Sequence, residues 1–139
     1  MRQTTVNSDL MTPTKIKLRK EDGSLSLEYN DGSHFYFTAE YLRVHSPSAE
    51  VRGHGEGQEV LQYGKKDVKI VSITPTGNYA IQLHFNDDHN TGIFSWDYLR
   101  ELGENQTANW ETYLEKLQQE GRHRDAELQV VQLVSPKQD

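Results

Sequence analysis

"LEYNDGSHFYFTAEYLR", residues 27–43, holds the pattern that decides the fold. Apolar and polar residues alternate on both sides of an Asp-Gly pair, and period-two alternation is typical of β-strands. Asp-Gly between such runs indicates a tight hairpin turn, because glycine accepts a positive φ and aspartate tolerates it. Thr38 follows the second run and can cap a short helix, with Glu40 in its first turn. The stretch therefore predicts a β-hairpin followed by a helical turn.

The same pattern returns at residues 83–100, "LHFNDDHNTGIFSWDYLR". Both copies contain an apolar residue, an aromatic residue, Asn-Asp, a polar turn, an apolar strand, an acidic residue and Tyr-Leu-Arg, and the second is one residue longer. In this alignment His89 stands where Ser33 stands in the first turn. We expect each Tyr-Leu pair to close the end of its own sheet. Two units are too few for a solenoid, and they can pack face to face or form one larger sheet.

Alternation also marks a strand over residues 15–20, which completes a three-stranded meander with the first hairpin, and another over residues 68–77. A short helix after the second hairpin is expected to end at Gly103. The period changes to that of a helix at "TANWETYLEKLQQEG", residues 107–121, which we expect to be capped by Thr107 or Asn109 and ended by Gly121. Its apolar face consists of Trp110, Tyr113, Leu114 and Leu117.

These elements predict an α+β fold with an antiparallel β-rich core, a duplicated hairpin–short helix unit and a C-terminal amphipathic helix. We divide the chain into a loose tail at 1–13, one domain at 14–121 and a polar tail at 122–139. The stretch "ELQVVQLV", residues 127–134, is compatible with an edge strand, a continued helix or a segment docked on the sheet.

Composition excludes several classes of function. The chain has 139 residues, enough for one domain, and a formal charge of −6, which opposes binding to nucleic acid or to anionic membranes. No apolar run approaches the roughly 20 residues of a transmembrane helix, and the N-terminus lacks the apolar core of a signal peptide, so we expect a cytoplasmic protein. Without cysteine there is no disulfide, thiolate metal site or cysteine nucleophile.

The segment after the first unit, "LRVHSPSAEVRGHGEGQ", residues 42–58, is richer in functional residue types than a connector needs. Its candidate binding residues are Arg43, Ser46, Ser48, Glu50, Arg52 and His54. One hypothesis is a metal site for zinc or iron formed by His45, His54 and His89, against the alternative of ordinary surface or hydrogen-bonding histidines. No pair of these histidines has the close spacing that marks strong metal sites.

Two other interpretations of this segment are an anion site and a hydrolase. The glycines with Arg43 and Arg52 could hold an anion, but neither a P-loop nor a dinucleotide motif is present, so a turn that needs glycine is favoured. A serine, a histidine and Glu50 include the residue types of a hydrolase, yet neither serine lies in a Gly-x-Ser-x-Gly elbow. Ser-Pro-Ser-Ala-Glu is better explained as a turn leading into a helix cap.

Several of these residues resemble a known family. Leu42-Arg43, Ser46-Pro47-Ser48, Asn86–His89, Trp96 and Tyr98-Leu99 are similar to the N-terminal domain of gamma-butyrobetaine hydroxylase and its bacterial stand-alone relatives, over roughly residues 14–121. The resemblance implies a small β-rich domain that, in the hydroxylases, precedes an iron- and 2-oxoglutarate-dependent catalytic domain. It also occurs fused to iron–sulfur carrier ATPases. The catalytic domain is absent from this sequence, so oxygenase activity does not transfer.

The resemblance also implies a structural zinc site in the hydroxylases, with three cysteines and one histidine. In this chain those positions are Ser46, Ser48, Val51 and His89. A serine hydroxyl stays protonated near neutral pH and is a poor zinc ligand, so the family's zinc is not expected here in its usual form.

We therefore predict a non-catalytic binding or accessory module that contacts a protein partner, such as a redox metalloenzyme or an iron–sulfur assembly protein. No cofactor is expected. The alternative is a zinc- or iron-binding protein that uses His45, His54 and His89, with weak enzymatic or iron-handling activity. The sequence does not identify the partner or the oligomeric state.

Overall fold

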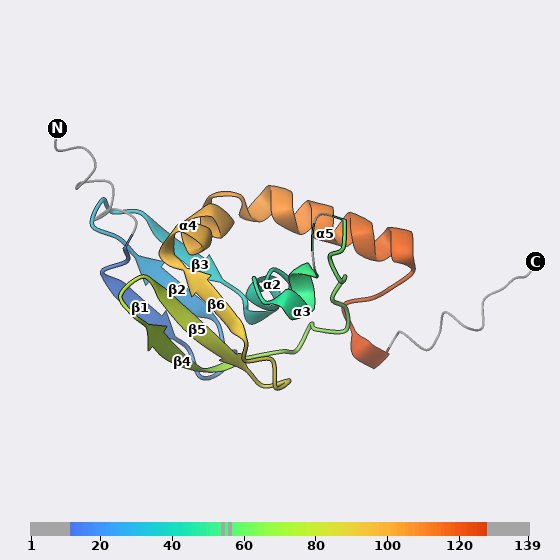
Figure 1. Ribbon diagram of the computed structural model, residues 1–139, viewed down its shortest axis with the longest axis horizontal. Helices are drawn as coiled ribbons and strands as arrows, with labels where there is room; N and C mark the ends of the chain where they lie inside the picture. The colour runs from blue at the N-terminus through green and yellow to red at the C-terminus, as the bar shows by residue number, and fades with distance from the viewer. Residues whose placement is uncertain (1–11, 54, 56, 128–139) are drawn as a thin grey trace, which may run out of the picture.

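The computed structural model describes residues 12–53, 55 and 57–127. Two antiparallel three-stranded sheets and four helices form the described fold (Figure 1). The first sheet contains β1 (Lys15–Leu18), β2 (Leu25–Glu28) and β3 (His34–Phe37), and the second contains β4 (Ile70–Thr76), β5 (Ala80–Phe85) and β6 (Gly92–Ser95). The helices are α2 (Ala39–Val44), α3 (Ala49–Arg52), α4 (Trp96–Glu104) and α5 (Gln106–Glu120). The predicted α+β fold and meander are confirmed.

The two predicted hairpin–helix units are β2-β3-α2 and β5-β6-α4, and each belongs to its own sheet. Their registers correspond, because Leu25 pairs with Phe37 in the first unit and Ile81 pairs with Phe94 in the second. Thr38 and Ser95 begin the two helices in the same way, since each side chain accepts the backbone N–H three residues later. Duplication in the sequence is therefore duplication in the structure.

One core joins the two sheets. Its fully buried members include the equivalent pairs Leu27 and Leu83, Phe37 and Phe94, and Leu42 and Leu99. Burying about ten such side chains supplies the main stabilisation of a domain of this size. The sheets thus remain separate and pack through their apolar faces, which decides between the two arrangements expected from the sequence.

The Tyr-Leu pairs close the units differently from our expectation. Both leucines enter the shared core, but each tyrosine hydroxyl contacts the other unit rather than its own sheet. The hydroxyl of Tyr41 donates to the carbonyl of Leu102 at 2.7 Å, and that of Tyr98 donates to the carbonyl of His45 at 2.6 Å. Each of these bonds between the units satisfies a carbonyl near the C-terminal end of a helix, where carbonyls have no partner within the helix itself.

Two details of the helices correct the sequence predictions, and a third confirms one of them. α4 continues through Gly103 to Glu104, because this glycine packs under the ring of Phe35 rather than ending the helix. α5 begins after Asn105, which makes no side-chain cap bond, so Thr107 and Asn109 lie inside the helix. Gly121 ends α5 with φ 66°, as predicted.

The apolar face of α5 is narrower than predicted. Tyr113 and Leu117 are buried and Trp110 is partly buried, but Leu114 is 39% exposed. Residues 122–127 follow α5, and the backbone of residues 123 and 124 accepts hydrogen bonds from the segment before β4. The ambiguous stretch at 127–134 falls, apart from its first residue, outside the described residues. No helix in the described part of the chain is long and apolar enough to cross a membrane.

Candidate functional site

The loop between α2 and α3 is attached to the turn between β5 and β6 by side-chain hydrogen bonds. The Oγ atom of Ser46 lies 2.8 Å from Nε2 of His89, and the Oγ atom of Ser48 lies 2.7 Å from Oγ1 of Thr91. Ser46 also accepts the backbone N–H of Ser48, and Ser48 caps α3 by accepting the N–H of Glu50. The structure confirms the interpretation of Ser-Pro-Ser-Ala-Glu as a turn that leads into a helix cap.

His89 connects this loop to Glu50. Its Nδ1 atom lies 2.9 Å from Oε1 of Glu50, whose side chain is 65% exposed, while His89 itself is 4% exposed. Burial lowers the pKa of His89, the guanidinium of Arg43 lowers it further, and Glu50 opposes the shift only in part. A neutral imidazole fits the bonds when Nδ1–H donates to Glu50 and Nε2 accepts the hydroxyl of Ser46.

Ser46, His89 and Glu50 are bonded in the order of a Ser-His-acid triad. Ser46 is 1% exposed, however, so its Oγ atom presents almost no surface to a substrate carbonyl. The Oγ atom also accepts the N–H of Ser48, which uses a donor that an oxyanion would need. The arrangement fits a structural connection better than a nucleophile.

The residues of the metal hypothesis have separate surroundings where the structure describes them. His89 contacts Ser46 and Glu50, whereas Nδ1 of His45 lies 2.8 Å from the carbonyl of Tyr41 within α2. His54 lies outside the described residues. Among the residues that the structure places, no group of three or more histidine, aspartate or glutamate side chains could hold a metal ion. The metal site stays a prediction, to be tested by elemental analysis of untagged protein.

The two arginines of the anion hypothesis have partners within the chain. Nε of Arg43 donates to Oδ2 of Asp87 at 2.9 Å, and Lys65 contacts the same oxygen at 2.6 Å. Burial alone would raise the pKa of Asp87, but Lys65 and Arg43 hold it below its ordinary value. The guanidinium carbon of Arg52 lies 5.0 Å from the ring centroid of Tyr98. Arg43 is thus used by the fold, and Arg52 remains exposed.

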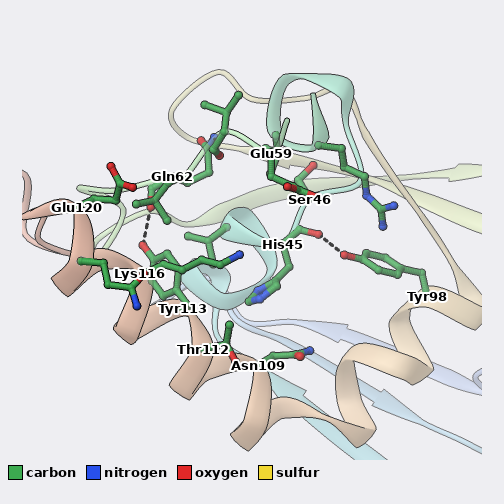
Figure 2. A pocket seen from close by; sticks show the side chains of 16 residues that line it. His45, Ser46, Glu59, Gln62, Tyr98, Asn109, Thr112, Tyr113, Lys116 and Glu120 are labelled. Atoms are coloured by element: carbon green, nitrogen blue, oxygen red, sulfur yellow. Dashed lines mark hydrogen bonds between the residues drawn. The ribbon is translucent and has the colours of Figure 1, made fainter. Parts of the chain in front are cut away.

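A pocket of about 560 Å³ opens between the loop and α5 (Figure 2). His45 and Tyr98 lie on one side and Tyr113 on the other, where its hydroxyl donates to the carbonyl of Gln62 at 2.8 Å. Burial lowers the pKa of His45, and Lys116 acts in the same direction. The polar lining comes mainly from one side of α5 and from the segment before β4, in Asn109, Thr112, Lys116, Gln119, Glu120, Glu59 and Gln62.

Sequence reasoning identified the loop side of this pocket, through His45, Ser46 and Arg52, but missed the side formed by α5. The helical period divides α5 into an apolar and a polar face, and it does not show that part of the polar face borders a pocket. No sequence signal identifies Gln62, because its place depends on how residues 59–66 run between the two units.

The fold and this loop together define a small α+β domain built from two hairpin–helix units, with a loop held by hydrogen bonds beside a mixed polar pocket. The family described as "Gamma-butyrobetaine hydroxylase-like, N-terminal" matches residues 16–100, and the chain belongs to this family. The resemblance inferred from the sequence is confirmed.

Several solved structures are similar to this chain in sequence and fold. Two solution NMR structures are 46% and 44% identical in sequence, with TM-scores of 0.72 and 0.70. The first match covers 83% of this chain and 90% of that chain, and the second covers 81% and 84%. A crystal structure from Acidithiobacillus ferrooxidans, a protein of unknown function in the DUF971 family, is 37% identical with a TM-score of 0.57, covering 68% of this chain and 96% of that one. No curated protein matches.

Proposed function

We propose that this protein is a non-catalytic binding domain that contacts a partner protein through the pocket between the α2–α3 loop and α5. The observation that carries the proposal is the combination of a loop whose reactive side chains are buried and bonded internally with an open pocket beside it. Ser46 and His89 are almost fully buried and contact each other, which disfavours attack on a substrate, whereas a pocket with mixed polar and apolar lining suits recognition.

The proposed partner is a redox metalloenzyme or an iron–sulfur assembly protein. The family description, which names the N-terminal part of a hydroxylase, supports a partner of this kind. The pocket rim carries Lys116, Glu59 and Glu120, so charged groups of both signs are available to orient a partner. Such rim charges contribute to specificity and to the rate of association more than to affinity.

Affinity recovery of the tagged full chain from its native cell tests the proposal. We expect an iron oxygenase or an iron–sulfur assembly protein to be recovered with wild type, and to be lost with Lys116→Glu. Lys20→Glu makes the same charge change on an exposed turn outside the pocket and should leave recovery intact. Repeated recovery of no such protein, or equal recovery with both variants, would overturn the proposal.

A second experiment examines the non-catalytic part of the proposal. Ser46→Ala removes the hydroxyl that His89 contacts and should lower the free energy of unfolding by about 1–3 kcal/mol, because a buried ring nitrogen loses its partner. Partner recovery should persist at a temperature where the variant is folded. An esterase or amidase activity that Ser46→Ala abolishes would contradict the proposal.

A further inference from the structure

Glu40 is an unusual residue in the duplicated fold. It lies in the first turn of α2 and is 5% exposed. Its equivalent in the second unit is Asp97, in the first turn of α4, which is exposed. Buried carboxylates are rare unless they are paired, so a feature outside the repeat must account for the burial of Glu40.

Arg124, beyond α5, is that feature. Its Nε and Nη2 atoms donate to the two carboxylate oxygens of Glu40 at 2.9 and 2.8 Å, and its guanidinium carbon lies 5.2 Å from the ring centroid of Trp110. A fork-shaped pair combined with an aromatic face is the arrangement that distinguishes a guanidinium from an ammonium. Glu40 and Trp110 thus form a site selective for an arginine side chain.

The backbone around Arg124 is held as well. Gly64 N–H donates to the carbonyl of residue 123 at 2.9 Å, and Lys66 N–H donates to the carbonyl of Arg124 at 3.0 Å. In peptide recognition, main-chain hydrogen bonds supply affinity and a side chain seated in a specific pocket supplies specificity. Residues 123 and 124 are therefore held against Glu40, Trp110 and residues 64–66 by the two kinds of contact that hold a bound peptide, and we call this surface the groove.

The groove has room for more than this segment. A cavity of about 450 Å³ adjoins Glu40 and Arg124 and is bordered by Tyr41, Trp110 and Glu111. Glu111 adds a second carboxylate near the site, which favours a cationic ligand. This cavity shares no lining residue with the pocket of Figure 2, so the two sites can be tested independently.

We propose that this groove recognises an arginine-bearing segment of a partner protein, and that residues 123 and 124 occupy it in the free chain and limit access to it. The intramolecular segment competes with any external one. The apparent affinity of the external segment is its intrinsic affinity multiplied by the fraction of time that the groove is open. Removal of the Arg124 side chain opens the carboxylate of Glu40 to an external arginine.

A peptide that copies residues 121–127 is the probe, titrated by fluorescence anisotropy into the full chain. We expect Arg124→Ala to bind the peptide at least about tenfold more tightly than wild type does, because the internal competitor has lost its side chain. Addition of Glu40→Gln to this variant should abolish the gain, and a peptide with Arg124→Ala should not bind. The matched control is Arg122→Ala, which removes an equal charge from the same segment, where the guanidinium contacts Tyr63, and should behave as wild type.

Circular dichroism establishes that each variant is folded. If Arg124→Ala does not fold, Arg124→Lys replaces it, since an ammonium keeps the charge without the fork, and a gain of at least about threefold is then expected. Equal affinity for wild type and the arginine variant, or a gain that survives Glu40→Gln, overturns the proposal. A wild-type dimer that depends on Arg124, seen by light scattering, would also overturn it, because the external segment would then belong to a second copy of this chain. If wild type recovers no partner, or Lys116→Glu recovers as much as Lys20→Glu, while peptide binding follows the expectation above, the proposed function is rejected and this site is not.

Discussion

The two hairpin–helix units make the same contacts with each other in both directions. Tyr41 bonds to the end of α4 and Tyr98 bonds to the end of α2. Arg43 of the first unit pairs with Asp87 in the turn of the second, and Arg100 of the second pairs with Asp31 in the turn of the first. These contacts occupy equivalent positions of the repeat, so the domain is organised like a small symmetric dimer joined in one chain.

One difference between the units bears directly on the candidate site. In the first, Phe35 of β3 packs against Gly103 of α4; in the second, Gly92 of β6 packs against Ser46, which follows α2. The large residue lies on the strand in one half, and the strand position is glycine in the other. The glycine therefore leaves space for the hydroxyl of Ser46, which His89 contacts, so the candidate site arises where the first unit has an aromatic side chain.

The largest effect is expected at the crossed ion pairs. Asp87→Asn should lower the free energy of unfolding by about 3 kcal/mol, because the Arg43 side chain, only 8% exposed, and Lys65 lose their carboxylate. Asp31→Asn removes the equivalent partner of Arg100, whose ion pair is more exposed, and should cost less. Urea unfolding of both variants measures the difference. An equal or larger loss of stability in Asp31→Asn would show that the greater burial of the Arg43–Asp87 pair does not increase its contribution to stability.

Much of this comparison could be predicted from the sequence. Local patterns predict the repeat, the hairpins, the Thr38 cap and the correspondence of His89 to Ser33 in the repeat, since alternation and turn residues act over a few positions. The crossing of the tyrosine bonds could not be predicted, because it depends on how two units pack. For the same reason, the local pattern predicts a helix end at Gly103, whereas this glycine leaves space for the ring of Phe35.

The candidate site was predictable only on its loop side. Ser46, Ser48 and His89 were identified from residue type and from the family resemblance, and the structure brings them together. Arg124 is far from Glu40 in sequence and carries no motif, so their pairing depends on the path of the chain after α5. Long-range contacts of this kind are not encoded in local periodicity.

The second prediction tests the exchange of large and small residues. Gly103→Ala would place Cβ 2.5 Å from Cγ of Phe35. Alanine normally stabilises a helix interior, but this overlap should reverse the sign and cost about 1–3 kcal/mol, measured by thermal or urea unfolding. Addition of Phe35→Leu should recover part of the loss. A Gly103→Ala variant more stable than wild type would show that the ring of Phe35 moves aside freely.

A smaller effect is expected from the tyrosine hydroxyls. Tyr41→Phe should cost about 1–2 kcal/mol, since the carbonyl of Leu102 loses its donor and the amide of Asn109 loses its acceptor. Tyr98→Phe removes the bond to the carbonyl of His45, which is only partly buried, and should cost about 1 kcal/mol. Urea unfolding of both single variants and the double variant measures the costs. A larger loss for Tyr98→Phe would contradict the greater burial and bonding of the Tyr41 hydroxyl.

The smallest effect is expected on the pH dependence of stability, at His45. The equivalent residue in the second unit is Leu102. Burial lowers the pKa of His45 from its ordinary value of 6.5, so the unfolded chain takes up a proton at a higher pH than the folded chain does. The stability contributed by neutral His45 is present above about pH 6.5 and is lost as the pH falls through the lowered pKa. His45→Leu copies the second unit and should reduce the difference in melting temperature between about pH 7.5 and about pH 5.5. Part of the difference should remain, because the pKa of His89 is lowered as well. An unchanged difference in the leucine variant would show that His45 does not contribute to the pH dependence.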